Sequence, residues 1–384
     1  MESAKLSSEN IALLTDLRRE LHRHPEVSHK ENDTAERLVE WSKTNLPSFE
    51  VKSIEGNHGV FFLFDSGKKG KHLVFRAELD ALPIEEDNTD LNYRSKNNGV
   101  GHLCGHDGHM TMVCGVGLMI ENEPPKSGRV TLLFQPAEET GEGAALVRKS
   151  DAFKDLNPDV IYALHNLPGH PIGQVMLKSD SMCLASTGLW IRLRGKTSHA
   201  AEPFAGNSPL RVFSPLINGL QFEKKDPIRI STLVHVQLGK PSFGTTPGNM
   251  DIALTIRAET DEQLDALIED VIESFREKAE LFDIRMKTER TEHFAAVTNH
   301  EEAVENIVQA ARKKDLKIKE MEAPTLWSED VGELMQGIKG ALFCLGSGED
   351  TPVLHHPTYN FPDELIPIGS EMFYEILLKE TEST

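Results

Sequence analysis

The stretch HLVFRAELD, residues 72–80, decides the fold of the larger part of this chain. Its apolar residues run on instead of alternating with polar ones, which is typical of a strand buried on both faces of a sheet. Similar runs recur at residues 59–64 (GVFFLF), 129–135 (RVTLLFQ) and 159–165 (DVIYALH), with helical stretches such as 108–121 between them. Strands and helices that alternate in this way predict an α/β domain with helices layered on a sheet.

The sequence pattern changes near residue 181. Three later segments alternate apolar with polar residues, namely 187–195 (TGLWIRLRG), 228–238 (IRISTLVHVQL) and 251–259 (DIALTIRAE). Such alternation favours a sheet with one face in water, and a helix at about 261–280 has its apolar residues on one stripe. We therefore expect a smaller antiparallel α+β domain, residues 181–294, inserted into the α/β domain, residues 1–180 and 295–384.

Length and charge narrow the functional classes. The chain has 384 residues, more than one hydrophobic core usually holds, so length also predicts two domains. Its 61 acidic and 41 basic side chains give a formal net charge of −20. Such a surface repels phosphate backbones and is not the polybasic kind that binds anionic lipid, so we expect neither nucleic acid nor a membrane as a partner.

The N-terminal segment and the cysteines predict a location. No run of about 18 apolar residues occurs in the sequence, so we expect no transmembrane helix. Residues 1–26 lack a basic segment followed by an apolar run, so we expect no secretory signal. Four scattered cysteines fit a reducing compartment better than a disulfide scaffold, and together these features predict a cytoplasmic protein.

The densest cluster of potential metal ligands is GHLCGHDGHM, which holds Cys104, His106, Asp107 and His109. The glycine between the first two allows the irregular turn with which Cys and His two residues apart can hold one metal ion. The cluster also stands just before a predicted helix. It therefore predicts metal binding, and the alternative is a surface loop that is rich in histidine.

Three more segments carry candidate ligands near predicted strand ends. Glu138 and Glu139 follow a strand, and in open α/β sheets ligands lie beyond the carboxyl ends of strands. One of two neighbouring carboxylates can bind metal while the other serves as general base, although such a pair can also be a solvated surface. His165 ends another strand, where a structural role is the alternative. Of the adjacent His355 and His356, at most one is expected to reach a given metal.

Together the segments are more informative than any one of them. The candidate ligands are Cys104, His106, Glu139, His165 and His355. A set of thiolate, imidazole and carboxylate groups suits zinc or a similar divalent ion, and five ligands exceed what one tetrahedral ion needs. We therefore expect two divalent ions in one site, with zinc as the first choice and manganese, cobalt or nickel as alternatives.

The order of the motifs resembles that of a known family. The segments are LHRHPE, RAELDALPIEE, GHLCGHDGHM, PAEETGEGA, ALHNLP, TSHAAEP, SED and LHHPTYNFPDE. Over nearly its whole length the sequence resembles the co-catalytic metallopeptidase and amidohydrolase family of hippurate hydrolases, auxin-conjugate hydrolases, N-acetyl-diaminopimelate deacetylases and other N-acyl-amino-acid deacylases. The resemblance implies a doubly wound, zinc-peptidase-like catalytic domain with an inserted lid domain that often forms a dimer.

The resemblance also implies a role for individual residues. It gives the same five metal ligands and makes Glu138 the general base. Asp80 would lie close behind the metal site, where the residues alone indicate a helix cap or a surface acid. His199 of the lid domain would help to hold the developing oxyanion, often from the partner subunit, and the alternative is a turn residue. Arg257 would clamp the substrate carboxylate, and the alternative is a solvent-facing strand arginine.

Three positions depart from the family pattern. Glu78 stands where relatives commonly have Asp, which places a longer acid behind the metal site. Aligned on Arg257, Gly244 falls where relatives often have an asparagine that would touch the substrate. Val331 follows SED where the family has phenylalanine. These departures concern the substrate rather than the metal ligands, so they leave the acyl group and the amino acid open.

The expected reaction is hydrolysis of the amide bond of an N-acyl amino acid by a metal-activated water, with Glu138 accepting the proton. A dipeptidase or carboxypeptidase of the same fold is one alternative. A metal-binding relative that has lost catalysis is another, although the retained Glu138 and ligand set argue against it. The expected partners are a small N-acyl amino acid or peptide and a second copy of the chain, bound through the lid domain.

Overall fold

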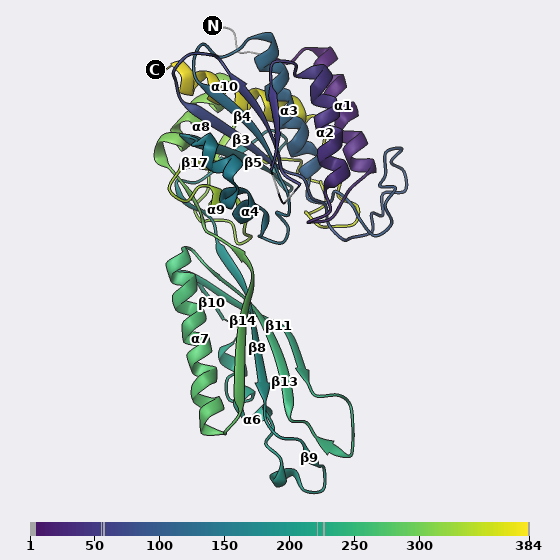
Figure 1. The fold of residues 1–384 in the computed structure, drawn as a ribbon, viewed down its shortest axis with the longest axis vertical. Helices are drawn as coiled ribbons and strands as arrows, with labels where there is room; N and C mark the ends of the chain where they lie inside the picture. Colours follow the sequence, from purple (N-terminus) through teal and green to yellow (C-terminus); the bar gives the residue numbers. More distant parts are fainter. Residues whose placement is uncertain (1–4, 55, 57, 221, 226, 383–384) are drawn as a thin grey trace. The chain divides into compact units, whose positions relative to one another are not determined.

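The computed structural model describes residues 5–54, 56, 58–220, 222–225 and 227–382. Contacts divide the chain into two compact units (Figure 1). Unit 1 consists of Met1–Met182, Val297–Pro324 and Asp330–Thr384, and unit 2 of Cys183–Ala296 and Thr325–Glu329. The smaller unit is thus an insertion in the larger one. It also takes in the short segment Thr325–Glu329, which sequence pattern alone places with the α/β domain.

Unit 1 is built on one eight-stranded mixed sheet. Its strands, in spatial order, are β1 (Glu50–Ser53), β2 (Val60–Asp65), β4 (Arg129–Gln135), β3 (His72–Glu78), β5 (Val160–Leu167), β17 (Lys339–Gly346), β6 (Val175–Leu177) and β16 (Ile318–Glu320). The four central strands, β4, β3, β5 and β17, run parallel, so their carboxyl ends meet at one edge of the sheet. β2 and β1 extend this core as antiparallel strands. A further two-stranded sheet joins β7 (Asp180–Cys183) to β15 (Val297–Asn299).

Helices cover both faces of this sheet. They are α1 (Ser8–Arg23), α2 (Asn32–Asn45), α3 (His106–Asn122), α4 (Gly143–Lys149), α5 (Asp151–Leu156), α8 (Glu301–Lys313), α9 (Val331–Leu334) and α10 (Leu365–Glu382). The neighbouring Phe61 and Phe62 of β2 show the two faces. Phe62 packs in the core that includes α3 and α10, whereas Phe61 meets Phe153 of α5 on the other side. Two-sided cover explains why every residue of β3 is buried, as its apolar run predicts. The predicted doubly wound α/β class is therefore confirmed.

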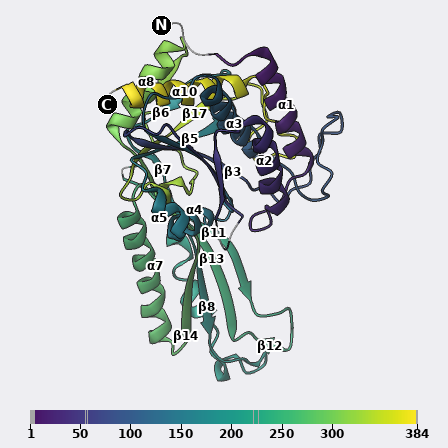
Figure 2. The same ribbon diagram turned by 45° about the horizontal axis from the view of Figure 1, so that its top comes forward.

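Unit 2 is a five-stranded antiparallel sheet with one long helix (Figure 2). The strands, in spatial order, are β10 (Phe222–Lys225), β11 (Ile228–Leu238), β13 (Asn249–Ala258), β8 (Ala185–Arg194) and β14 (Arg285–Phe294). The helix α7 (Asp261–Leu281) begins after Thr260, whose side chain accepts the Gln263 backbone N–H. Its apolar stripe packs with Leu189, Ile191 and the other inward residues of the sheet. β8 alternates buried and half-buried residues because only one face is covered.

Smaller elements complete unit 2. A ribbon of β9 (Ser198–His199) and β12 (Thr245–Thr246) continues beyond the sheet, and the short helix η1 (Pro203–Ala205) packs against β9. The short helices α6 (Leu210–Phe213) and η2 (Ile217–Gly219) follow along the chain. Across the residues that the structure describes, no helix is both long and apolar enough to span a membrane.

Candidate metal centre

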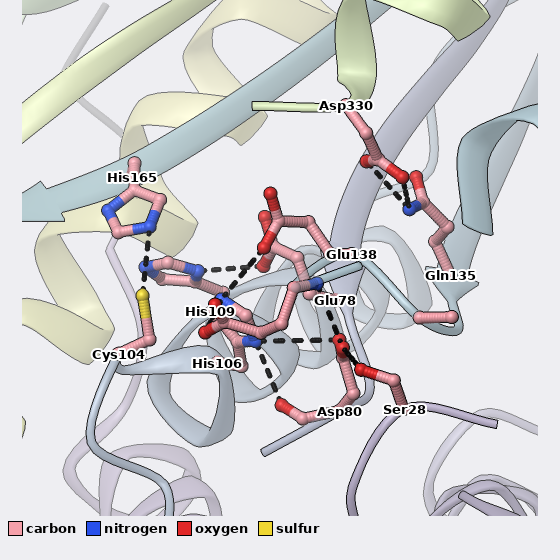
Figure 3. Close-up of polar contacts among 12 residues, drawn as sticks. Ser28, Glu78, Asp80, Cys104, His106, His109, Gln135, Glu138, His165 and Asp330 are labelled. Atoms are coloured by element: carbon pink, nitrogen blue, oxygen red, sulfur yellow. Dashed lines mark hydrogen bonds and ion pairs between the residues drawn. The ribbon is translucent and has the colours of Figure 1, made fainter. Parts of the chain in front are cut away.

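The predicted site residues of unit 1 gather at the carboxyl edge of the parallel strands (Figure 3). Asp80 follows β3, Glu138 and Glu139 follow β4, and His165 lies near the end of β5. Because these three strands are parallel neighbours, their ends bring the side chains together. Cys104 precedes α3 and faces the same place from the side.

The ligand atoms form overlapping groups rather than separate ones. One group is Cys104, His106 and His165, a second is Cys104, Glu139 and His355, and a third is His106, Glu138 and Glu139. Within each group all ligand atoms lie within 4.8 Å of one another. Cys104 Sγ lies 3.5 Å from His165 Nε2. Shared members make this one cluster, large enough for two ions that have ligands in common.

Both buried histidines are held with the same nitrogen inward. His106 donates its Nδ1–H to the Asp80 carbonyl at 2.8 Å, and His165 donates its Nδ1–H to the Asn166 carbonyl at 2.8 Å. Such bonds fix the ring so that Nε2 faces the cluster, where its lone pair can bind an ion once that nitrogen carries no proton. The backbone of two strand ends therefore orients two ligands before any ion binds.

The His106 Nε2 atom tests whether a cation fits. It is buried and has no hydrogen-bond partner among the described residues. It lies 3.9 Å from Glu138 Oε2 and 3.9 Å from Glu139 Oε1, which is too far for a hydrogen bond but suits groups around a common ion. A buried polar atom without a partner is costly, and a divalent ion would satisfy it. These residues therefore fit the expected metal.

Asp80 ties the two ligand-bearing segments together. Its Oδ2 accepts the Ser28 Oγ–H at 2.7 Å and the Glu139 backbone N–H at 3.0 Å. Its Oδ1 lies 3.7 Å from His106 Nδ1. Asp80 is fully buried, so it is neither a surface acid nor a helix cap. It holds the turn of Glu139 against the ring of His106.

Two tight turns shape the site. Gly105 has φ of 101°, and a Cβ there would lie 2.2 Å from Asn166 Oδ1. This left-handed residue lets α3 begin at His106, two residues earlier than the apolar pattern predicts. After β4, the chain turns so closely that a Cβ on Gly143 would lie 1.6 Å from the Pro136 carbonyl oxygen. The turn directs the two adjacent glutamates, Glu138 and Glu139, into the site.

Asp107 and His109 have other partners, although the sequence also makes them candidate ligands. Asp107 Oδ2 accepts the Arg18 Nη1–H at 3.1 Å and lies 2.9 Å from His22 Nδ1. His109 donates its Nδ1–H to Glu78 Oε2 at 2.7 Å. Its Nε2 lies 2.7 Å from the side-chain oxygen of the asparagine that follows His165. Both residues therefore brace the cluster from behind.

Sequence reasoning missed the network behind Glu78. The fully buried Arg76 contacts Glu78, donates to Gln135 Oε1 at 2.9 Å and donates to Asp330 Oδ1 at 2.6 Å. The signal was present, because an arginine and a glutamate in a strand buried on both faces must pair with something. The long side chain of Glu78 spans from Arg76 to His109, so the departure from Asp serves a contact.

The buried charges shift the ionisation of the ligands. Burial disfavours a charged His106, but Glu78, Glu139 and Asp80 outweigh it and raise the pKa of His106 to about 9. Burial, together with the charge of His109, lowers the pKa of His165 to about 3. Without metal, therefore, His106 carries a proton at neutral pH and His165 does not.

The remaining predicted residues lie at the rim or in unit 2. His355 donates its backbone N–H to the Leu103 carbonyl at 2.8 Å, and its Nε2 lies 3.7 Å from Glu139 Oε2. Its side chain is 48% exposed, so it closes the outer side of the cluster. The next residue, His356, instead contacts Thr358. His199 lies on β9 and Arg257 on β13, both in unit 2.

Known proteins share this organisation. The model of peptidase family M20/M25/M40 matches residues 74–379. The chain is 30% identical over 380 residues to the N-acetyldiaminopimelate deacetylase of Ligilactobacillus salivarius (strain UCC118), covering 96% of this chain and 97% of that protein. It is 29% identical over 370 residues to the N-acetyl-L-cysteine deacetylase of Bacillus subtilis (strain 168), covering 94% of this chain and 86% of that protein.

A solved structure shows the same fold. The Bacillus subtilis YXEP protein, a dinuclear metal-binding peptidase, superimposes with a TM-score of 0.85 over 99% of this chain and 100% of that one, at 24% identity. The family model and the curated relatives thus confirm the resemblance that the motifs indicate, and this structure confirms the fold.

Cys104→Ala should lower the metal content of the purified protein, because the variant removes a ligand shared by two of the groups. The control is Cys114→Ala, since Cys114 is also buried but lies within α3, and burial raises the pKa of its thiol. Elemental analysis should find less metal in the first variant and unchanged metal in the second. Full metal occupancy in Cys104→Ala would remove Cys104 from the ligand set.

Metal affinity should rise with pH. At pH values below the His106 pKa of about 9, an incoming ion must displace the proton of His106. Each pH unit between about 6 and 8.5 should therefore raise the metal affinity about tenfold per displaced proton. Zinc titrations against a chelator of known affinity, repeated at several pH values, measure this slope. An affinity that does not change with pH would contradict a protonated metal-free site.

Proposed function

Because the chain belongs to peptidase family M20/M25/M40, we propose that it is a metal-dependent amidohydrolase that removes the acyl group from N-acyl amino acids. The observation that carries this is the buried cluster in which His106 Nε2 faces two adjacent glutamates beside a thiol and a second imidazole. The names of the two relatives, N-acetyldiaminopimelate deacetylase and N-acetyl-L-cysteine deacetylase, support this substrate class.

Two divalent ions are the proposed cofactors, with zinc as the first choice because a thiolate and imidazoles favour it. Manganese, cobalt and nickel are the alternatives. The residues that would hold the ions are Cys104, His106, Glu139, His165 and His355. When bound, such ions polarise the amide carbonyl and lower the pKa of a bound water to roughly 7.

Glu138 is the proposed general base. Its side chain is 7% exposed, and its Oε2 lies 3.9 Å from His106 Nε2, beside the place where water would attack. The backbone of the neighbouring Glu139 is fixed by Asp80, so the two carboxylates have separate roles. Glu138 would take a proton from the attacking water and return it to the leaving amine.

Arg257 is the proposed clamp for the substrate carboxylate. It is partly buried, and burial lowers its pKa. Its Nη1–H donates to Ser328 Oγ at 2.7 Å, and within the described parts of the chain it makes no ion pair. A partly buried guanidinium without an acidic partner is suited to a carboxylate ligand, which it can bind through two parallel hydrogen bonds.

His199 is the proposed donor to the oxyanion. Its Nδ1 accepts the Ala201 backbone N–H at 3.1 Å. In the neutral ring the proton is therefore assigned to Nε2, which is left as an exposed donor. A donor of this kind is what a developing oxyanion needs, and loss of one typically costs a factor of about 10²–10³ in rate.

The geometry of unit 2 supports a dimer. Arg257 pairs with Ser186 at one end of β13, whereas Asn249 pairs with Arg194 at the other end, and His199 lies beyond it. Eight residue steps along a strand span about 26 Å, at about 3.3 Å each. One small N-acyl amino acid cannot span that distance. Arg257 and His199 can therefore act on one substrate only if they come from two copies.

An open strand edge offers a place for the second copy. One edge of β11 pairs with β13 along its length, and β10 covers the opposite edge only as far as Ser231. In the described chain, that second edge is therefore open over residues 232–238. Val234 and Val236 on this stretch are exposed. An exposed apolar edge strand readily pairs with another chain. We therefore place the dimer contact on the lid domain.

The proposed location is the cytoplasm. All four cysteines are buried, at positions scattered along the chain: Cys104, Cys114, Cys183 and Cys344. A buried thiol needs no oxidising compartment, and a thiol ligand must stay reduced to bind metal.

Glu138→Gln should keep its metal, but its rate of turnover should fall about 10²–10⁴-fold, because an amide cannot accept the proton. The matched control is Glu142→Gln in the same turn, where the exposed Glu142 contacts His29. Hydrolysis of N-acetyl amino acids and elemental analysis measure the two effects. Equal rates in wild type and Glu138→Gln would remove Glu138 as the base.

Arg257→Met should lower kcat/KM for N-acetyl-L-methionine by about 10- to 100-fold, because it removes a charged hydrogen-bond pair. N-acetyl-L-methionine amide lacks the carboxylate and should be a poor substrate for both proteins, with no further loss in the variant. Arg192→Met on β8 is the control, since Arg192 pairs with Glu289 near the surface. Equal losses with the acid and the amide would argue against the clamp.

The same assay separates the alternative reaction. A dipeptide such as L-alanyl-L-methionine has a free amine on the acyl side of the bond, and an N-acyl amino acid does not. Faster cleavage of the dipeptide than of any N-acyl methionine would favour a dipeptidase over the proposed amidohydrolase.

A further inference from the structure

Two phenylalanines close to His199 in the ribbon stand fully in solvent: Phe204 follows it by five residues, and Phe243 precedes by two the Thr245 that pairs with it. We define the tip ribbon as residues 198–206 and 243–246, which comprise β9, η1 and β12. Phe204 in η1 is 100% exposed and Phe243, just before β12, is 107% exposed. Figure 1 shows β9, and Figure 2 β12, at the end of unit 2. Two wholly exposed aromatic side chains on one short, otherwise small and polar ribbon indicate a contact with something apolar.

The tip ribbon is ordered by its own hydrogen bonds. The Glu202 backbone N–H donates to the His199 carbonyl at 2.8 Å, and the Ala205 N–H donates to the Glu202 carbonyl at 3.1 Å. These bonds set the turn that carries Phe204 at a fixed place after His199. Across the ribbon, the Ala200 N–H donates to the Gly244 carbonyl at 3.0 Å, which fixes Phe243 beside the same turn. Both aromatic side chains are thus presented by defined backbone.

Gly244 leaves a gap at this place. A Cβ built on Gly244 meets no atom within 4 Å, so the surface next to the His199 turn is open. Thr245 pairs with His199 in the register of the ribbon, which puts the gap one residue away from that pair. The ribbon therefore offers a hydrogen-bond donor, an open space and two apolar side chains within a few residues of one another.

We propose that Phe204 and Phe243 bind the acyl group of the substrate and select a bulky apolar acyl chain, aliphatic or aromatic, over acetyl. The proposal rests on the proposed function. The substrate carboxylate is taken by Arg257 and the carbonyl oxygen by His199. The acyl substituent is attached directly to that carbonyl carbon, on the side away from the carboxylate, so the neighbours of His199 are the groups that it meets. Contact with it would take the two rings out of water.

The test compares acyl groups on the whole enzyme. The substrates are N-acetyl, N-octanoyl and N-benzoyl derivatives of several amino acids, including methionine, lysine and aspartate, with zinc or manganese supplied. The variants are Phe204→Ala, Phe243→Ala and the double variant. Leu281→Ala is the matched control, because Leu281 is an exposed apolar residue at the end of α7, outside the tip ribbon.

Wild type should have a higher kcat/KM for the octanoyl or benzoyl substrate than for the acetyl one. In the double variant, that ratio of kcat/KM values should fall at least about tenfold. The rate of the double variant on N-acetyl substrates should change less than about threefold. Leu281→Ala should keep the wild-type ratio. An unchanged ratio of kcat/KM values in a folded double variant would overturn the proposal. An equal loss of kcat/KM on every substrate, together with a weaker dimer in sedimentation, would also overturn it, because the two rings would then belong to the contact between subunits. Absence of hydrolysis of every substrate by wild type would overturn the proposed function, and this inference with it.

Discussion

The structure depends on a set of buried polar atoms that converge at the carboxyl edge of the central sheet. His106 Nε2 lies 3.9 Å from a carboxylate oxygen of Glu138 and 3.9 Å from one of Glu139. The thiol of Cys104 lies beside His165 Nε2 in the same cluster. Convergent buried groups of this kind are stabilised by positive charge, which the proton of His106 supplies in the metal-free site and a divalent ion would supply when bound. The strand order and the network behind the site can both be understood as ways to hold this arrangement.

Orientation is supplied by the backbone and by residues that never touch the metal. Carbonyl groups fix the inward nitrogens of both buried histidines, and Asp80 links the turn of Glu139 to the ring of His106. Behind them, Arg76 joins Glu78, Gln135 and Asp330 in a fully buried cluster. Breaking such a cluster leaves an uncompensated charge, at a cost of about 3–5 kcal/mol, so rigidity at the site and stability of the sheet share the same residues.

Much of this could be predicted from the sequence, for a physical reason in each case. Continuous apolar runs predict strands buried on both faces, and β3 is buried throughout. Clustered Cys, His and Glu at strand ends predict a site because parallel strands end together. What could not be predicted depends on distant contacts. Asp107 and His109 look like ligands in the sequence but point to Arg18 and Glu78. The start of α3 at His106 depends on the left-handed Gly105, which no apolar pattern records.

The most direct measurement is anomalous X-ray diffraction from crystals of the zinc-loaded protein, recorded on both sides of the zinc absorption edge. We expect two anomalous peaks per chain inside the cluster, one bordered by Cys104, His165 or their neighbours and one by His106, with Glu139 in contact with at least one of them. Peaks that lie elsewhere on the chain, or zinc bound without the sulfur of Cys104 and the imidazole of His106, would contradict it.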